Sequence, residues 1–158
     1  MAHEYAQHIA EAIDSFLTGD DWKYQFDADK GLFDMGISVK GQLSSCRLKI
    51  RVNEDHYLVY ACISMQADEA SRMKVCDFIT RANYGLRNGN FELDLRDGEI
   101  RYKSYVDCGE DGYALPDPAI IKKSIYIPAQ MMQRYGDGLL AVMYGFQEPE
   151  AAIQEIEG

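Results

Sequence analysis

The chain has 158 residues, of which 47% are apolar, so it can bury a sizeable core without disulfides or metal ions. Acidic side chains (26) outnumber basic ones (16), and the formal net charge is −10. That charge disfavours binding to phosphate backbones or anionic membranes, and it indicates either high solubility or a basic partner. We therefore expect a single domain over residues 1–158, with neither nucleic acid nor membrane as its partner.

The cysteines and the N-terminal region indicate the compartment. No apolar run reaches the roughly 18 residues that a membrane span requires, and the start of the chain lacks the pattern of a signal peptide. The four cysteines contain no Cys-x-x-Cys pair, so buried, reduced thiols and a cytoplasmic location are expected. Cys108, beside Gly109 in a predicted loop, is expected to be the most exposed thiol and the one candidate for redox chemistry.

The first half of the chain predicts a helix followed by four strands. Apolar residues at helical spacing indicate a helix over residues 3–18, which Gly19 should end. Alternating apolar and polar residues then predict strands, and the turn residues between them predict short connections. The last strand is almost entirely apolar, which is typical of a central strand covered on both faces. The four predicted strands are residues 22–26, 33–39, 46–52 and 57–64.

A helix over residues 68–84, with Asp68 as its N-cap, separates these strands from a predicted hairpin over residues 91–106. Asp97-Gly98 is typical of a two-residue hairpin turn, which would give the hairpin one apolar and one charged face. The same turn sets a register in which opposite charges face each other across the strands. The expected pairs are Arg96 with Glu99, Asp94 with Arg101, and Glu92 with Lys103.

The C-terminal third of the sequence predicts two helices, and the start of the first one is ambiguous. Asp117-Pro118 is a possible helix start, whereas Ile125–Ile127 before Pro128 favours an extended segment that enters a helix at Pro128. Pro149 begins a final helix. Taken together, the elements predict an α+β fold in which a three- to four-stranded antiparallel meander and a hairpin pack against helices.

No constellation for catalysis, a cofactor or a metal ion emerges from the sequence. His56 lies beside Glu54 and Asp55 but lacks a second pair of ligands at a familiar spacing. Motifs for activated nucleophiles, nucleotide phosphates and calcium loops are absent. We expect no enzymatic activity and no cofactor, although a reaction centre assembled from distant residues remains an alternative.

One cationic stripe stands out in this acidic chain. Arg47, Lys49 and Arg51 alternate along a predicted strand, so they share one face of the sheet. In one interpretation this is a solvated face that Asp34 and its neighbours neutralise. In the other it is an interaction surface for an acidic partner or for self-association.

Several segments resemble the YbjN-like family, over roughly residues 20–157 in element order. The resemblance is carried by Asn83, by Asn88-Gly89-Asn90-Phe91-Glu92-Leu93-Asp94 and Asp97-Gly98-Glu99-Ile100-Arg101-Tyr102, by Tyr144-Gly145, and by Pro149-Glu150-Ala151-Ala152. It implies a fold like that of type III secretion chaperones and a sensory-transduction regulator without established enzyme activity. Fold likeness alone does not establish a chaperone role.

The leading hypothesis is therefore a non-enzymatic protein-binding or regulatory module, chaperone-like and acting as a homodimer with a protein partner. The alternative is a small-molecule sensor with a pocket between helices and sheet.

Overall fold

The computed structural model describes residues 2–158 as one antiparallel sheet combined with four helices. All neighbouring strands of the six-stranded sheet run antiparallel, in the order β1-β2-β3-β4-β6-β5. The helices are α1 (Gln7–Gly19), α2 (Arg72–Asn83), α3 (Pro118–Met143) and α4 (Pro149–Glu157). The strands are β1 (Gln25–Asp27), β2 (Leu32–Ser38), β3 (Ser45–Val52), β4 (His56–Cys62), β5 (Asn90–Leu93) and β6 (Ile100–Asp107).

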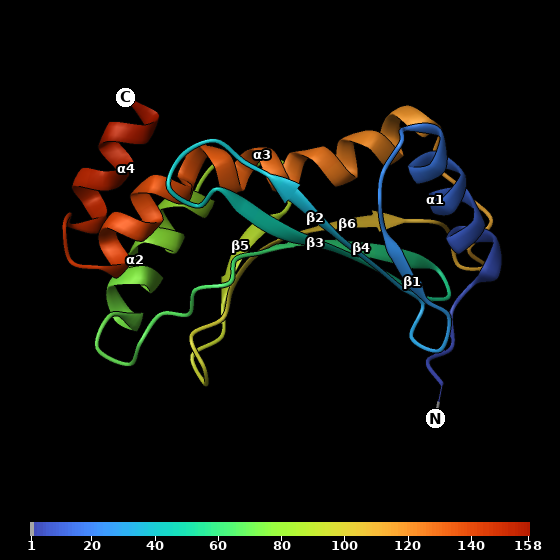
Figure 1. The fold of residues 1–158 in the computed structure, drawn as a ribbon, viewed down its shortest axis with the longest axis horizontal. Helices are drawn as coiled ribbons and strands as arrows, with labels where there is room; N and C mark the ends of the chain where they lie inside the picture. Colours follow the sequence, from blue (N-terminus) through green and yellow to red (C-terminus); the bar gives the residue numbers. More distant parts are fainter. Residues whose placement is uncertain (1) are drawn as a thin grey trace.

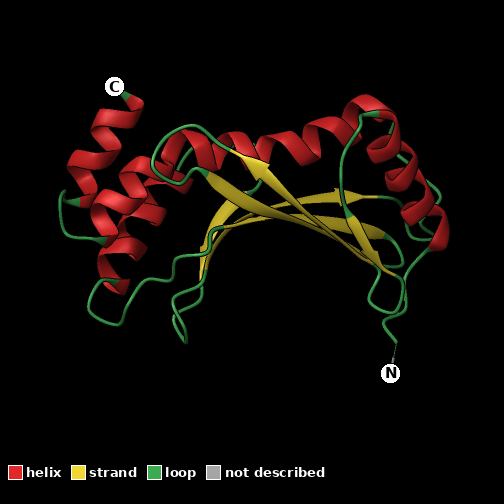
Figure 2. Cartoon of the chain, in the orientation of Figure 1, coloured by secondary structure: helices red, strands yellow, loops and turns green. Residues whose placement is uncertain are grey.

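The long helix α3 runs across one face of the sheet, as Figures 1 and 2 show. Helix α1 lies near one end of α3, whereas α2 and α4 lie together at the other end (Figure 1). The opposite face of the sheet carries no helix within the part of the chain described (Figure 2). The meander β1–β4 and the hairpin β5–β6 therefore form a two-layer α+β structure, which confirms the predicted fold class.

The core fills the space between α3 and the sheet. Successive strand residues point to opposite faces, so every second residue of the central strands is buried there. Leu48, Ile50 and Val59 are each 0% exposed, and Ile125 and Met132 of α3 are equally buried. This apolar layer supplies the main stabilisation of the fold.

Several predicted boundaries shift at the N-terminal end. The first helix begins at Gln7 rather than residue 3, because the preceding segment bonds to two turns of the sheet: His3 N–H donates to Asp29 O (2.8 Å) and Ala6 N–H donates to Asn53 O (3.1 Å). The first strand covers only Gln25–Asp27. Helix α2 also starts late, at Arg72; Asp68 instead accepts a bond from Ser71 N–H (2.8 Å) in the preceding turn.

Strand β4 is central in the sheet, as predicted, but it is covered on one face only. Tyr57, Val59 and Ala61 are buried beneath the helices, whereas Leu58 and Tyr60 are half-buried on the open face. The nearly continuous apolar run therefore correctly predicted a central strand, but wrongly predicted that both faces of that strand are covered. The reason is that tyrosine and leucine remain partly solvated among the long side chains of neighbouring strands.

The hairpin register differs from the predicted one by two residues. Glu92 lies opposite Arg101 and Leu93 lies opposite Ile100, so a longer loop replaces the two-residue turn. Asp94 N–H donates to Glu99 O (2.9 Å), which closes that loop. A shift of two residues keeps each side chain on its predicted face, since the period of a strand is two. The predicted pair of Glu92 with Lys103 still forms, but Glu92 also contacts Arg101, and Asp94 contacts Arg96 in place of Arg101.

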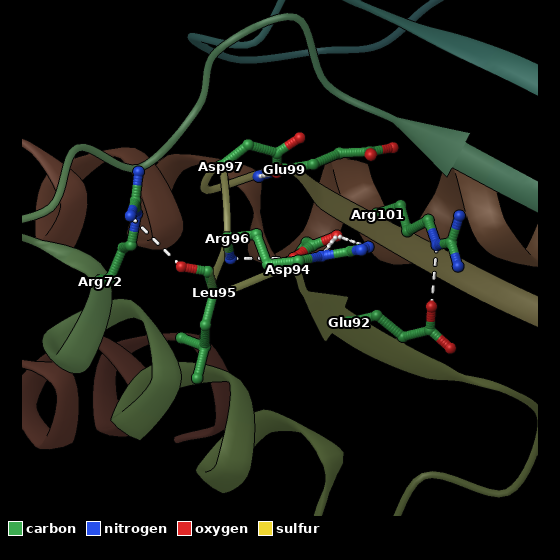
Figure 3. Close-up of polar contacts among 8 residues, drawn as sticks. All are labelled: Arg72, Glu92, Asp94, Leu95, Arg96, Asp97, Glu99 and Arg101. Carbon is green, nitrogen blue, oxygen red and sulfur yellow. Dashed lines mark hydrogen bonds and ion pairs between the residues drawn. The ribbon is translucent and has the colours of Figure 1, made fainter.

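Contacts with the start of α2 explain the longer loop. Ala67 N–H donates to Gly98 O (2.9 Å), and the Arg72 guanidinium donates to Leu95 O (3.2 Å; Figure 3). Gly98 has φ +83°, and a Cβ there would lie 1.9 Å from Ala67 O, so only glycine fits. Leu95, at the tip of this loop, is 55% exposed.

Helix α3 is continuous from Pro118 to Met143, so the extended entry before Pro128 is wrong. Asp117 caps the helix, because its side chain accepts a bond from Ile120 N–H. Pro128 lacks an N–H group and leaves the Ser124 carbonyl without its usual helical donor. The buried hydroxyl of Ser104 on β6 donates to that carbonyl instead (3.1 Å). The sheet therefore supplies the bond that makes an internal proline acceptable.

Cys108 also departs from expectation. It is fully buried rather than exposed, and its burial raises the pKa of the thiol to about 11. The backbone of Cys108 is bonded on both sides: Ala114 N–H of the following loop donates to Cys108 O (2.8 Å), and Cys108 N–H donates to Asp55 O (2.8 Å). A thiol in this state is a poor nucleophile at neutral pH.

Candidate functional site

The open face of the sheet brings the predicted cationic stripe together with side chains from two further strands. Register places Cys62 between Arg47 and Arg101, and Tyr60 between Lys49 and Lys103, in two rows across β3, β4 and β6. A third row contains Arg51, Leu58 and Tyr105. We call these side chains the open-face patch: Arg47, Lys49, Arg51, Leu58, Tyr60, Cys62, Arg101, Lys103 and Tyr105.

Ion pairs neutralise part of this patch. The Arg47 guanidinium contacts Asp34 Oδ1 on β2 at 2.7 Å, which is the balancing role that the sequence suggested for Asp34. Arg101 and Lys103 share one carboxylate, Glu92 on β5. Arg101 Nε lies 2.8 Å from Glu92 Oε2, and Figure 3 shows this contact.

Two cations of the patch remain unpaired. Among residues 2–158, Lys49 and Arg51 make no ion pair within 4.0 Å. Both side chains are only half-buried, so both charges are accessible from solvent. Within the stripe, Asp34 thus neutralises the charge of Arg47, whereas the positive charges of Lys49 and Arg51 have no ion-pair partner among residues 2–158.

The tyrosine at the centre of the patch is held by a cation. The Arg101 guanidinium lies over the ring of Tyr60, 4.3 Å from its centroid. Such a contact fixes both side chains at a modest energetic gain. The patch therefore combines an ordered tyrosine with arginine, two residue types that are enriched in protein interfaces.

Three hollows in the surface are lined in part by residues of the open-face patch. One, of about 170 Å³, lies between Lys49, Arg51, Tyr60 and Arg101, and a second, of about 360 Å³, shares Lys49 with it. A third, of about 730 Å³, continues from Arg101 along the hairpin tip. Because the hollows share lining residues, they form an irregular track across the open face rather than a closed pocket.

Electrostatic shifts on this face have structural causes. Burial alone would raise the pKa of Glu92, but hydrogen bonds from Lys103 and Arg101 outweigh it, so the pKa lies below its ordinary value. The pKa of Asp94 falls to about 2, chiefly because the Arg96 side chain donates to it. Burial raises the pKa of Cys62. These shifts keep the carboxylates ionised at neutral pH and describe a charged surface rather than proton-transfer groups.

The sequence predicted three members of the patch and missed the rest. Period-two alternation placed Arg47, Lys49 and Arg51 on one face, and the structure confirms that placement. Arg101 and Lys103 alternate in the same way along β6, so a signal for them existed. Nothing local indicated that β6 pairs with β4 rather than lying at an edge.

The remaining sequence candidates lie outside the patch. His56 Nδ1 contacts Asp55 Oδ1 at 2.5 Å, and within residues 2–158 no three histidine, cysteine, aspartate or glutamate side chains are grouped to hold a metal ion. In the same range, no helix has both the length and the apolar character needed to cross a membrane.

The fold and the patch define a class: an α+β protein with one helix-covered sheet face and one open, charged face. The model of the YbjN family, described as "Putative bacterial sensory transduction regulator", matches residues 10–140. The chain therefore belongs to the YbjN family. This finding confirms the resemblance that the hairpin and C-terminal segments indicated.

Other comparisons add little. No curated protein matches the sequence. One similar solved chain comes from the "Structure of the HopA1-SchA Chaperone-Effector Complex", with 15% identity, a TM-score of 0.37, and coverage of 86% of this chain and 90% of that one. A likeness at this TM-score is too distant to assign a shared partner or activity.

Proposed function

We propose that this chain is a non-enzymatic protein-binding regulator, chaperone-like in its mode of action, and that the open-face patch is its docking surface. The chain would act as a homodimer in the cytoplasm. The observation that supports the proposal most directly is the uncovered sheet face, where unpaired Lys49 and Arg51 flank the ordered Tyr60.

The physical argument concerns the cost of leaving this face uncovered. Leu58 and Tyr60 keep part of their apolar surface in water, and burying it against a partner is favourable at roughly 25 cal/mol per Å². An ordered aromatic residue also loses little side-chain entropy on binding. Family membership in a group described as regulators is consistent with such a role.

Site-specific photo-crosslinking in bacterial cells tests the proposal. A benzoyl-phenylalanine in place of Tyr105, which lies on the open face and is 56% exposed, should yield discrete protein adducts. The matched control replaces Tyr144, which is 58% exposed but lies at the C-terminal end of α3. Mass spectrometry identifies the crosslinked protein, and its binding to the chain is then tested with both proteins purified.

Adducts at residue 105 and none at residue 144 are the expected result. Equal labelling at both positions, or no adduct at 105, would contradict the assignment of the open face. Light scattering on the purified chain checks the homodimer separately, and the expected mass is twice that of one chain.

A small-molecule sensor is the second candidate function. The space between helices and sheet, where the sequence placed its pocket, is occupied by buried core side chains. A groove of about 340 Å³ lies instead between α1 and the start of α3, beside Ala12, Phe16 and Ile121. A metabolite that fills it should raise the melting temperature of the chain, and Ala12→Trp should abolish that rise.

A further inference from the structure

We propose that the open-face patch binds an extended, acidic segment of another protein, in which carboxylates at alternate positions contact Lys49 and Arg51. This inference rests on the proposed function and names the chemistry of the partner. It is carried by charge complementarity and by the spacing of the unpaired cations.

The charge of the patch contrasts with that of the whole chain. Five cations gather on β3 and β6, the two strands that flank β4, in a molecule whose formal net charge is −10. Their carboxylate neighbours are Asp34, Glu92 and, at the edge of the hollow, Glu99. The patch thus keeps an excess of positive charge, which attracts acidic groups and repels basic ones.

The spacing of Lys49 and Arg51 fits an extended ligand. They are two residues apart on β3, so their side chains emerge about 6.8 Å apart on the same face. An extended peptide repeats its own side chains at the same interval and on one side. Carboxylates at positions i and i+2 of the peptide therefore match both cations at once. The remaining side chain positions can contact Tyr60 and Leu58.

Nucleic acid fits this face less well. Phosphate binding draws on several cations together, and affinity rises with the number of phosphates neutralised. Here Glu92 and Asp34 already occupy the other three cations, and the overall charge repels polyanions at long range. An acidic peptide with two carboxylates and apolar residues requires only two cations and an apolar surface, and Lys49, Arg51 and Tyr60 provide these.

A second copy of the chain fits less well too. A two-fold axis through the patch would bring each set of unpaired cations toward the other set. Like charges in a desolvated interface are costly. The homodimer contact therefore lies on another surface, and the partner on the open face is a different protein.

Fluorescence anisotropy with synthetic peptides tests the inference on the full chain. The probe is a labelled eight-residue peptide in which glutamate alternates with tyrosine. Its controls are a peptide with glutamine in place of glutamate, a peptide of the same composition with the glutamates clustered at one end, and an oligothymidine of equal length. The alternating acidic peptide should bind most tightly, and its affinity should fall as salt rises.

Charge-reversal variants locate the site. Lys49→Glu with Arg51→Glu should weaken binding of the alternating peptide by about tenfold or more. The control, Lys122→Glu with Lys123→Glu, makes the same charge change at two exposed positions on α3 and should alter affinity by less than about twofold. Circular dichroism checks folding, and the milder Lys49→Gln with Arg51→Gln replaces any variant that fails to fold.

Equal binding of the glutamine peptide, equal loss in both variants, or tighter binding of oligothymidine would overturn the inference. The two proposals fail separately. Adducts at residue 105 without acidic-peptide binding would leave the protein-binding function standing and remove this partner chemistry. Absence of any protein adduct would remove the function itself.

Discussion

The two faces of the sheet use the same strands for opposite purposes. On the helix-covered face, Ile50 and Leu48 are fully buried, whereas on the open face Arg51 and Lys49, their immediate neighbours in sequence, meet solvent. One face excludes water and stabilises the fold. The other retains charges and half-buried aromatic side chains at the surface. Stability and binding capacity can therefore be changed independently, one residue apart along the same strand.

The sharpest test of this comparison is a pair of neighbouring truncations. Ile50→Ala removes fully buried methylene and methyl groups and should lower the free energy of unfolding by about 2–5 kcal/mol. Arg51→Ala, on the open face and without an ion pair among residues 2–158, should change it by no more than about 0.5 kcal/mol. Urea denaturation measures both. Similar losses of unfolding free energy in the two variants would mean that the open face also contributes to the stability of the fold.

The second test concerns the bond between β6 and the proline of α3. Ser104→Ala should cost about 1–3 kcal/mol, because it leaves the buried Ser124 carbonyl without a donor. Pro128→Ala supplies a backbone N–H group at the position from which a helix would normally donate to that carbonyl. The cost of Ser104→Ala should therefore be smaller when Pro128→Ala is also present.

Denaturation of the four members of this cycle gives the coupling energy. Strictly additive costs would show that the Ser104 hydroxyl acts through something other than the carbonyl freed by the proline.

The smallest expected effect is a change in acid stability on the open face. The pKa values of Glu92 and Asp94 are depressed in the folded chain, so their contribution is present above the unfolded pKa of about 4 and is lost as pH falls. For Asp94 the loss extends down to about pH 2.

Glu92→Gln and Asp94→Asn should each flatten the fall in melting temperature as pH drops below about 4, and for Asp94→Asn the effect should extend to about pH 2. Glu69→Gln, at an exposed position in the turn before α2, is the control and should leave the slope unchanged. An unaltered slope in all three variants would show that the ion pairs of this face are too solvated to matter.

Prediction from sequence succeeded where the signal is local and periodic. Alternation along residues 46–52 was enough to place Arg47, Lys49 and Arg51 on one face, because a strand has only two. It failed where distant segments decide. The hairpin loop is longer than Asp97-Gly98 suggests because the segment before α2 bonds to its tip. Cys108 is buried where its backbone bonds to Ala114 and to Asp55, which is far away in the sequence.

Local sequence patterns alone determined most element types, the α+β class and the face on which each strand residue lies, since backbone geometry and hydrophobic spacing act over a few residues. Tertiary structure decided the strand order, the hairpin register and the continuation of α3 through Pro128. The physical reason is that each of these depends on hydrogen bonds or contacts between segments far apart in the chain. The open-face patch exists only because β6 pairs with β4 and so brings Arg101 and Lys103 to the stripe on β3.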